Sequence, residues 1–201
     1  PGKKRLRRIS AARADGAAAI VKVTRTELPD VLLLEPRVHQ DERGFFLESY
    51  NRRTFREATG LDHEFVQDNT SFSVRNVLRG LHYQIHQPQG KLVQAVAGEI
   101  FDVAVDLRRG SPTFGRWVGV TLTGGGHRMV WIPPGFAHGY IVLSEHAIVF
   151  YKTTDFYAPE HERTIVWNDR DLGIRWPLEG DPIVSDKDRR GTALKSAETF
   201  A

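Results

Sequence analysis

A histidine, an arginine and a lysine lie close together in one stretch of the sequence. The stretch reads VLRGLHYQ over residues 77–84 and is followed by Lys91. A histidine can take a proton near neutral pH, and an ammonium group can stabilise developing negative charge. Arg79 and His82 have opposite parity, so a regular strand would point them to opposite faces. If both enter one site, the strand must bulge or kink, and Gly80 is the natural place. A lone histidine on a strand is more often structural, so the context has to decide.

A second candidate is the histidine of the segment WIPPGFAHG at 131–139. Its Pro-x-Gly-x-x-His pattern, which ends at His138, resembles the second motif of the cupins. A metal-binding cupin would need a His-x-His pair and a glutamate on an earlier strand, but Tyr83 and Gln84 follow His82. His82 and His86 are four residues apart, and no third ligand is evident. We therefore expect a cupin-like fold without a metal.

Two further polar segments lie later in the chain. Paired aromatic residues occur at 151–157, followed by Glu162. Such aromatics usually belong to a core, but they could also supply a phenol as an acid and a platform that stacks on a base. The segment at 185–188 reads SDKD and would normally be a solvated loop.

Short segments with a two-residue period must position these groups. Residues 45–50 and 101–107 alternate as strands do, and more short β-rich segments follow at 64–67, 77–84, 92–97, 117–122, 129–132, 140–143, 147–152 and 164–167. One helix is expected between Asn51 as its cap and Gly60 at its end, and a second short helix near the C-terminus. The pattern predicts an all-β fold, a sandwich or a jelly-roll barrel, as a single domain over residues 21–201.

The segment around Asp102 has one wholly apolar face and one face that carries Asp102 and Asp106. In a small barrel, inward polar residues indicate a ligand cavity. From periodicity alone, we expect instead that these two aspartates lie on the solvent face of a half-exposed strand.

The composition is that of an ordinary globular chain, with 40% apolar and 26% charged residues. The lack of cysteine removes thiol chemistry and suits a reducing cytoplasm. No apolar run is long enough to span a membrane.

Five basic residues lie within the first ten positions, a pattern that also occurs in nucleic-acid-binding arms and in signal peptides. Arg13 and Asp15 interrupt any apolar signal core, and the remainder has no basic stripe. We expect residues 1–20 to be a disordered basic extension, with no nucleic-acid or membrane partner.

Six segments, taken in order, resemble the motifs of one enzyme family. They are DERGFF at 41–46, FVQDN at 65–69, VLRGLHYQ at 77–84, DVAVD at 102–106, GFAHG at 135–139 and IRWP at 174–177. The ordered set is similar to the dTDP-4-dehydrorhamnose 3,5-epimerases from about residue 21 to residue 188. The resemblance implies a cupin-like jelly-roll barrel, a homodimer that exchanges N-terminal strands, and chemistry without a cofactor.

By this resemblance, His82 is the catalytic base and Tyr151 the acid. Asp188 orients and charges His82, and Lys91 stabilises the enolate. Tyr157 falls on the position that stacks against thymine. The remaining substrate-contact positions are Arg43, Glu48, Gln67, Asn69, Arg79, His138, Glu162 and Lys187.

The implied reaction inverts C3 and C5 of dTDP-4-dehydro-6-deoxy-D-glucose and gives dTDP-4-dehydro-L-rhamnose for L-rhamnose biosynthesis. The C4 ketone acidifies both C–H bonds, so a base and an acid on opposite faces of the ring suffice. Four alternatives stay open. They are a mono-epimerase acting at C3 or C5 only, a keto-isomerase of the same fold, a non-catalytic cupin-like sugar-binding module, and a metal-dependent dioxygenase.

Overall fold

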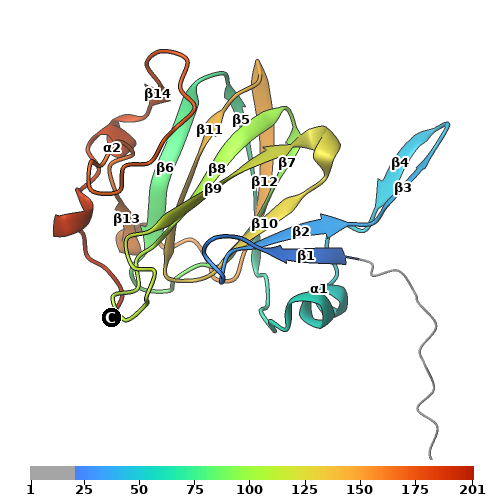
Figure 1. The fold of residues 1–201 in the computed structure, drawn as a ribbon, viewed down its shortest axis with the longest axis horizontal. Helices are drawn as coiled ribbons and strands as arrows, with labels where there is room; N and C mark the ends of the chain where they lie inside the picture. The colour runs from blue at the N-terminus through green and yellow to red at the C-terminus, as the bar shows by residue number, and fades with distance from the viewer. Residues whose placement is uncertain (1–20) are drawn as a thin grey trace, which may run out of the picture.

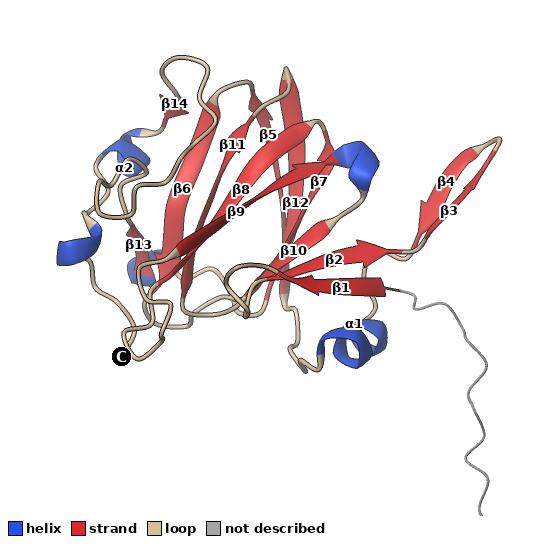
Figure 2. Ribbon diagram, viewed as in Figure 1, coloured by secondary structure: helices blue, strands red, loops and turns tan. Residues whose placement is uncertain are grey.

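The computed structural model describes residues 21–201, and the extension expected over residues 1–20 lies outside them. Two large sheets that pack face to face form the body of the described chain, with a few short helices at the edges (Figure 1, Figure 2). This is the jelly-roll barrel of the cupin type that the sequence predicts.

Each large sheet combines strands that are distant in the sequence. The first has the order β1-β2-β10-β7-β12-β5, formed by Val21–Arg25 (β1), Leu32–Pro36 (β2), Met129–Ile132 (β10), Lys91–Ala97 (β7), His146–Thr153 (β12) and Gln67–Val74 (β5). The second has the order β13-β6-β11-β8-β9, formed by Glu162–Thr164 (β13), Val77–Gln84 (β6), Phe136–Val142 (β11), Glu99–Asp106 (β8) and Trp117–Thr123 (β9). The short strand β14 (Ile183–Val184) pairs in parallel with β6.

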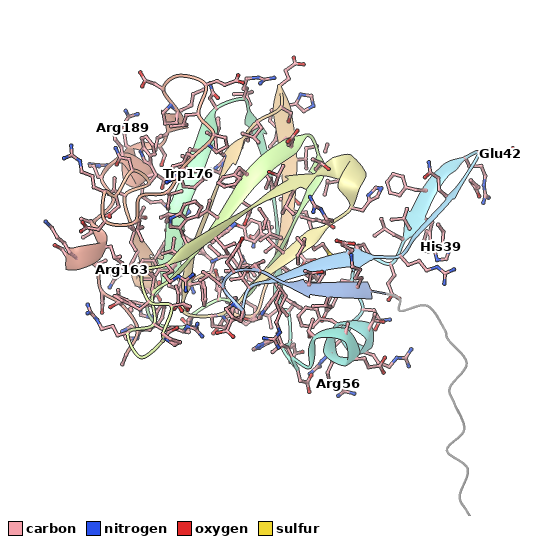
Figure 3. The ribbon with its side chains drawn as sticks, in the orientation of Figure 1. His39, Glu42, Arg56, Arg163, Trp176 and Arg189 are labelled. Carbon is pink, nitrogen blue, oxygen red and sulfur yellow. The ribbon has the colours of Figure 1, made fainter. Side chains whose placement is uncertain are left out.

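A separate hairpin stands away from the two sheets. It consists of β3 (Val38–Asp41) and β4 (Gly44–Leu47). Its residues His39 and Glu42 lie well outside the barrel (Figure 3). Phe45 and Phe46 on β4 remain 61% and 73% exposed, although the Phe45 ring lies against His127 with ring centroids 4.3 Å apart, so the hairpin presents apolar surface to solvent.

The expected helix is confirmed as α1 (Arg52–Thr59). The Asn51 side chain accepts hydrogen bonds from the backbone N–H groups of Arg53 and Thr54, and Gly60 ends the helix with a φ of 75°. The buried face of α1 carries Phe55, which packs edge-on against Trp131. The remaining helical segments are α2 (Asp186–Arg189) and the 3-10 turns η1 (Gly124–Gly126), η2 (Pro159–His161) and η3 (Leu194–Ser196). None of the helices within 21–201 is long and apolar enough to cross a membrane.

The main core lies between the sheets, where Val93 and Val149 of the first sheet join Ile100 and Ala104 of the second in one buried cluster. A second cluster lies on the other face of the second sheet. There the C-terminal part of the chain covers β6, β8 and β11. Both faces of the second sheet are therefore buried.

The expectation of a solvent-facing Asp102 and Asp106 is wrong. Both are buried, with 1% and 0% exposure. The apolar face of β8, with Val103 and Val105, packs under the C-terminal cover beside Ile165, so the polar face turns into the barrel. Asp106 is bound there by the Arg108 guanidinium and the Ser111 and Thr113 hydroxyls. These donors outweigh the effect of burial and lower the Asp106 pKa to about 2.

Several predicted strand boundaries are shifted. The strand expected at 64–67 begins only at Gln67, and that expected at 164–167 lies at Glu162–Thr164. The segment 77–84 matches β6 in full, and 129–132 matches β10. Most of β5 and the strands β1, β2, β3 and β14 do not fall in any of the segments predicted as strands.

Candidate active site

A cavity of about 340 Å³ lies inside the barrel. Ten of the thirteen expected site residues line it: His82, Tyr151, Lys91, Gln67, Asn69, Arg79, His138, Tyr157, Glu162 and Lys187. They come from both sheets, from the loop after β12 and from α2. The fold thus gathers polar side chains from segments up to 120 positions apart, the separation of Gln67 and Lys187.

A break in β6 brings Arg79 and His82 into the same cavity. Gly80 has a φ of 124°, and a Cβ atom there would lie 2.8 Å from the carbonyl oxygen of His138. Along β11, His138 faces His82 and Tyr140 faces Arg79, so the register shifts by one residue between these pairs. The irregularity expected at Gly80 is confirmed, and it turns two side chains of opposite parity to one side.

His82 is paired with a buried carboxylate. Its Nε2 atom lies 2.5 Å from Oδ1 of Asp188, whose side chain is 4% exposed, and the Gly80 N–H donates to Oδ2 at 3.3 Å. Burial raises the pKa of Asp188, but the hydrogen bond and charge of His82, with help from Gly80, outweigh it and hold that pKa below the ordinary value. Asp188 therefore stays ionised and accepts from Nε2. The Nδ1 atom of His82 is the ring nitrogen left to take a proton.

Tyr151 approaches the cavity from the other sheet. It lies on β12, directly opposite Asn69 of β5, and is half-buried. Burial raises its pKa, the neighbouring Tyr140 phenol raises it further, and the Arg79 guanidinium opposes both. The phenol therefore keeps its proton at neutral pH and can act as an acid.

Lys91 opens β7 and is only 7% exposed. Burial lowers its pKa to about 8, although the charges of Glu162 and Asp102 favour the ammonium form. A buried ammonium with few water contacts stabilises negative charge on a bound molecule better than an exposed one does.

A second histidine–carboxylate pair borders the cavity through its histidine, and sequence reasoning missed its carboxylate. His138 Nε2 lies 2.8 Å from Oδ2 of Asp102, and both side chains are buried. The signal for Asp102 was present in the polar face of residues 101–107, but that face was assigned to solvent. The pair fixes the His138 ring where it borders the cavity.

A polar bridge crosses the rim of the cavity. Glu162 accepts from the Tyr157 hydroxyl at 3.1 Å and from the Lys187 ammonium at 2.9 Å. The Gln67 side chain accepts from the Tyr157 backbone N–H and donates to Asn69, both at 2.9 Å. The half-exposed Tyr157 ring is thus held at the mouth by two neighbours.

Arg43 and Glu48 lie outside this cavity. Arg43 is on the projecting hairpin, where its guanidinium pairs with Asp41. Glu48 accepts from Asn51 at 3.0 Å and from the Thr54 hydroxyl at 3.1 Å, beside α1. Neither residue reaches the cavity of its own chain.

Within residues 21–201, no three His, Asp or Glu side chains are grouped so that they could hold a metal ion. His82 is bound to Asp188, and His86 lies edge-on to His161 with ring centroids 5.0 Å apart. The two histidines considered above as a ligand pair therefore have separate partners.

An imidazole paired with a carboxylate and a protonated phenol enter one barrel cavity from different sheets, beside a buried ammonium. On a cupin-like fold, this set of groups is typical of an acid–base isomerase. The family model described as dTDP-4-dehydrorhamnose 3,5-epimerase matches residues 25–196. The chain belongs to the dTDP-4-dehydrorhamnose 3,5-epimerase family.

Individual relatives agree with this placement. The dTDP-4-dehydrorhamnose 3,5-epimerase of Pseudomonas aeruginosa is 64% identical over 180 residues, covering 90% of this chain and 99% of the relative. The epimerase RmlC of Legionella pneumophila, solved in complex with dTDP-4-keto-L-rhamnose, is 49% identical with a TM-score of 0.87, covering 89% of this chain and 95% of that one. The 3'-monoepimerase ChmJ of Streptomyces bikiniensis, solved with dTDP-quinovose, is 35% identical with a TM-score of 0.80, covering 85% and 87%.

Proposed function

We propose that the chain catalyses the 3,5-epimerisation of dTDP-4-dehydro-6-deoxy-D-glucose to dTDP-4-dehydro-L-rhamnose. The observation that carries the proposal is the placement of His82, with Asp188 behind it, and Tyr151 on different sheets around one cavity. A sugar ring between them has a base on one face and an acid on the other.

The first step is the removal of a proton next to the ketone. His82 takes the proton from C3 or C5 through Nδ1, and the ionised Asp188 stabilises the imidazolium that forms. The electron pair of the broken C–H bond moves onto the C4 oxygen and gives an enolate. Lys91 stabilises that oxygen by charge, with His138 beside it.

The second step returns a proton to the opposite face. Tyr151 donates its phenolic proton to the carbon, the C4 ketone re-forms, and the centre is inverted. The same pair then acts at the other carbon after both groups have exchanged protons with solvent. Tyr157 at the rim offers a face for the thymine ring, and Arg79 and Lys187 offer positive charge to the diphosphate.

Arg43 and Glu48 serve this reaction only from another copy of the chain. We propose a homodimer in which the hairpin β3–β4 extends to a second subunit. In support, the hairpin projects away from the barrel (Figure 1). Its residues Phe45 and Phe46 are exposed. We place this dimer in the cytoplasm, as the family resemblance implies.

The test is turnover in heavy water. The purified protein is incubated with dTDP-4-keto-6-deoxyglucose in D₂O, and NMR follows C3 and C5. We expect deuterium at both carbons and the L-configured product. Exchange at one carbon alone would make the chain a mono-epimerase, as the relative ChmJ is. Binding of dTDP without any exchange would instead make it a sugar-binding module.

A further inference from the structure

Two hydroxyl groups in the cavity take no part in the chemistry proposed above. Tyr140 on β11 and Ser71 on β5 both line the cavity, and their side-chain oxygens are 2.8 Å apart. β11 belongs to one sheet and β5 to the other, so this hydrogen bond crosses the barrel interior. A contact that joins the two walls of the cavity affects the depth of the cavity and the polarity of its floor.

Strand registers place this pair at the bottom of the cavity. Tyr151 lies opposite Asn69, and the next inward position along β5 is Ser71, opposite the fully buried Val149. The Tyr140 side chain, 4% exposed, belongs to the apolar core cluster that also contains Val149. The two hydroxyls therefore mark the boundary between apolar core and polar cavity, one layer below Tyr151.

The pair has hydrogen-bonding capacity left over. Each hydroxyl brings one O–H group, and the contact between Tyr140 and Ser71 uses only one of the two. Among the described residues, the other acceptor recorded for Ser71 Oγ is the Val149 carbonyl at 3.5 Å, the outer limit of a hydrogen bond. A phenylalanine would fill the same apolar space, while a buried hydroxyl costs free energy unless it is paired. The spare donor and the free lone pairs therefore face the cavity that both residues line.

We propose that Tyr140 and Ser71 form a subsite for a secondary hydroxyl of the hexulose ring and thereby determine which 4-keto sugar the enzyme accepts. The inference rests on the proposed function, because that function places the sugar ring between His82 and Tyr151, directly above the pair. A ring hydroxyl donates and accepts at once, which matches one spare O–H and free lone pairs. A methyl group at that place would leave the pair unsatisfied.

The sugar offers two such hydroxyls, at C2 and at C3, and substrate analogues distinguish them. We would measure kcat/KM for deuterium exchange at C5 with the parent sugar and with its 2-deoxy and 3-deoxy analogues. The proteins are the wild type, Tyr140→Phe, Ser71→Ala and the control Tyr50→Phe. Tyr50 loses a phenolic hydroxyl in the control, and it lies in the aromatic cluster with Phe65 outside the cavity.

We expect the wild type to lose roughly 3- to 10-fold in kcat/KM on one of the two analogues relative to the parent. Tyr140→Phe should lose a similar factor on the parent and little on that analogue, because the partner hydroxyl is already gone. This coupling between protein and substrate identifies the ring position. Ser71→Ala should show the same coupling, and it carries the test if Tyr140→Phe does not fold. Tyr50→Phe should leave all three substrates unchanged.

Equal losses on all three substrates would overturn the subsite and leave Tyr140 and Ser71 with a packing role. Unchanged rates in both variants would overturn it as well. If the wild type shows no exchange with the parent sugar, the proposed function falls, and the subsite for this sugar falls with it. If the wild type exchanges deuterium but the variants and the analogues show no coupling, only the subsite proposal is rejected and the proposed function stands.

Discussion

His82 and Asp188 are 106 positions apart in the sequence, yet Nε2 of the histidine lies 2.5 Å from Oδ1 of the aspartate. The contact forms because β6 carries His82 along the second sheet and α2 folds back against that strand, with β14 pairing alongside it. The Ser185 hydroxyl caps α2 by accepting from the Asp188 N–H at 3.1 Å. A serine cap thus fixes the carboxylate on which the base depends.

The charge of Asp188 should matter more to the rate than to the fold. Asp188→Asn keeps the shape of the side chain but removes the charge that stabilises a protonated His82. We expect kcat to fall by roughly 10²- to 10⁴-fold with KM little changed. His82→Ala should lose a comparable factor as the general base. Exposed His146, outside the cavity, is the control, and His146→Ala should keep full activity. Near wild-type turnover in either cavity variant would reject the assignment of the base.

Tyr151→Phe should separate proton removal from inversion. His82 can still deprotonate the sugar in this variant, so deuterium should enter at one carbon by return to the same face. Without the phenol, no proton arrives on the opposite face, and the L-configured product should not accumulate. NMR of the product mixture in D₂O distinguishes these results. Complete inversion by the variant would remove Tyr151 from the role of acid.

The lowered pKa of Lys91 predicts opposite effects on activity and on stability. In the proposed mechanism the ammonium form stabilises the enolate, so kcat/KM should decline as the pH rises through about 8, by about tenfold per pH unit. In the folded state the same ammonium is disfavoured by burial. That penalty is fully present below about pH 8 and is relieved as the pH rises towards 10.5, where the unfolded lysine also loses its proton.

Lys91→Met should therefore be inactive but more stable than the wild type at pH 7, by up to about 3 kcal/mol. The gain should shrink as the pH approaches 10. Urea unfolding at several pH values measures this difference. Lys152→Met is the control, because Lys152 pairs with Asp68 outside the cavity and should change stability by less than about 1 kcal/mol. A less stable Lys91→Met at pH 7 would contradict the burial penalty.

Gly80→Ala should damage both the fold and the site. Its φ of 124° is unfavourable for any side chain, and a Cβ atom would lie 2.6 Å from the Cα of Gly139. We expect a loss of more than about 2 kcal/mol and the separation of Arg79 from His82. Gly44 has a φ of 125° but open space around it, so Gly44→Ala isolates the backbone cost. Thermal unfolding of the two variants should differ by the clash alone, and equal losses would show that contact with β11 is unimportant.

Much of the fold could be read from the sequence where the signal is local. The β-rich segments at 77–84 and 129–132 match β6 and β10 with their correct bounds, and Asn51 and Gly60 mark both ends of α1. The site residues were reached differently, through ordered motifs that resemble a family. Asp102 shows the limit of local patterns. Its strand has one polar face, and periodicity cannot say whether water or the barrel interior lies on that side.

The sequence by itself determined several of the strands, both ends of α1, the need for a break at Gly80 and the kinds of side chain available for acid–base chemistry. These follow from backbone preferences and from periods of a few residues, which are local properties. The family resemblance already implied that Asp188 meets His82. Only the tertiary structure decided that Asp102 meets His138, that Tyr140 meets Ser71, and that Arg43 lies outside its own barrel. Those pairings join segments that are distant in the sequence, and they exist because the two packed sheets bring these segments together around one barrel interior. On β8, the apolar face packs under the C-terminal cover, so the face with Asp102 turns into that interior.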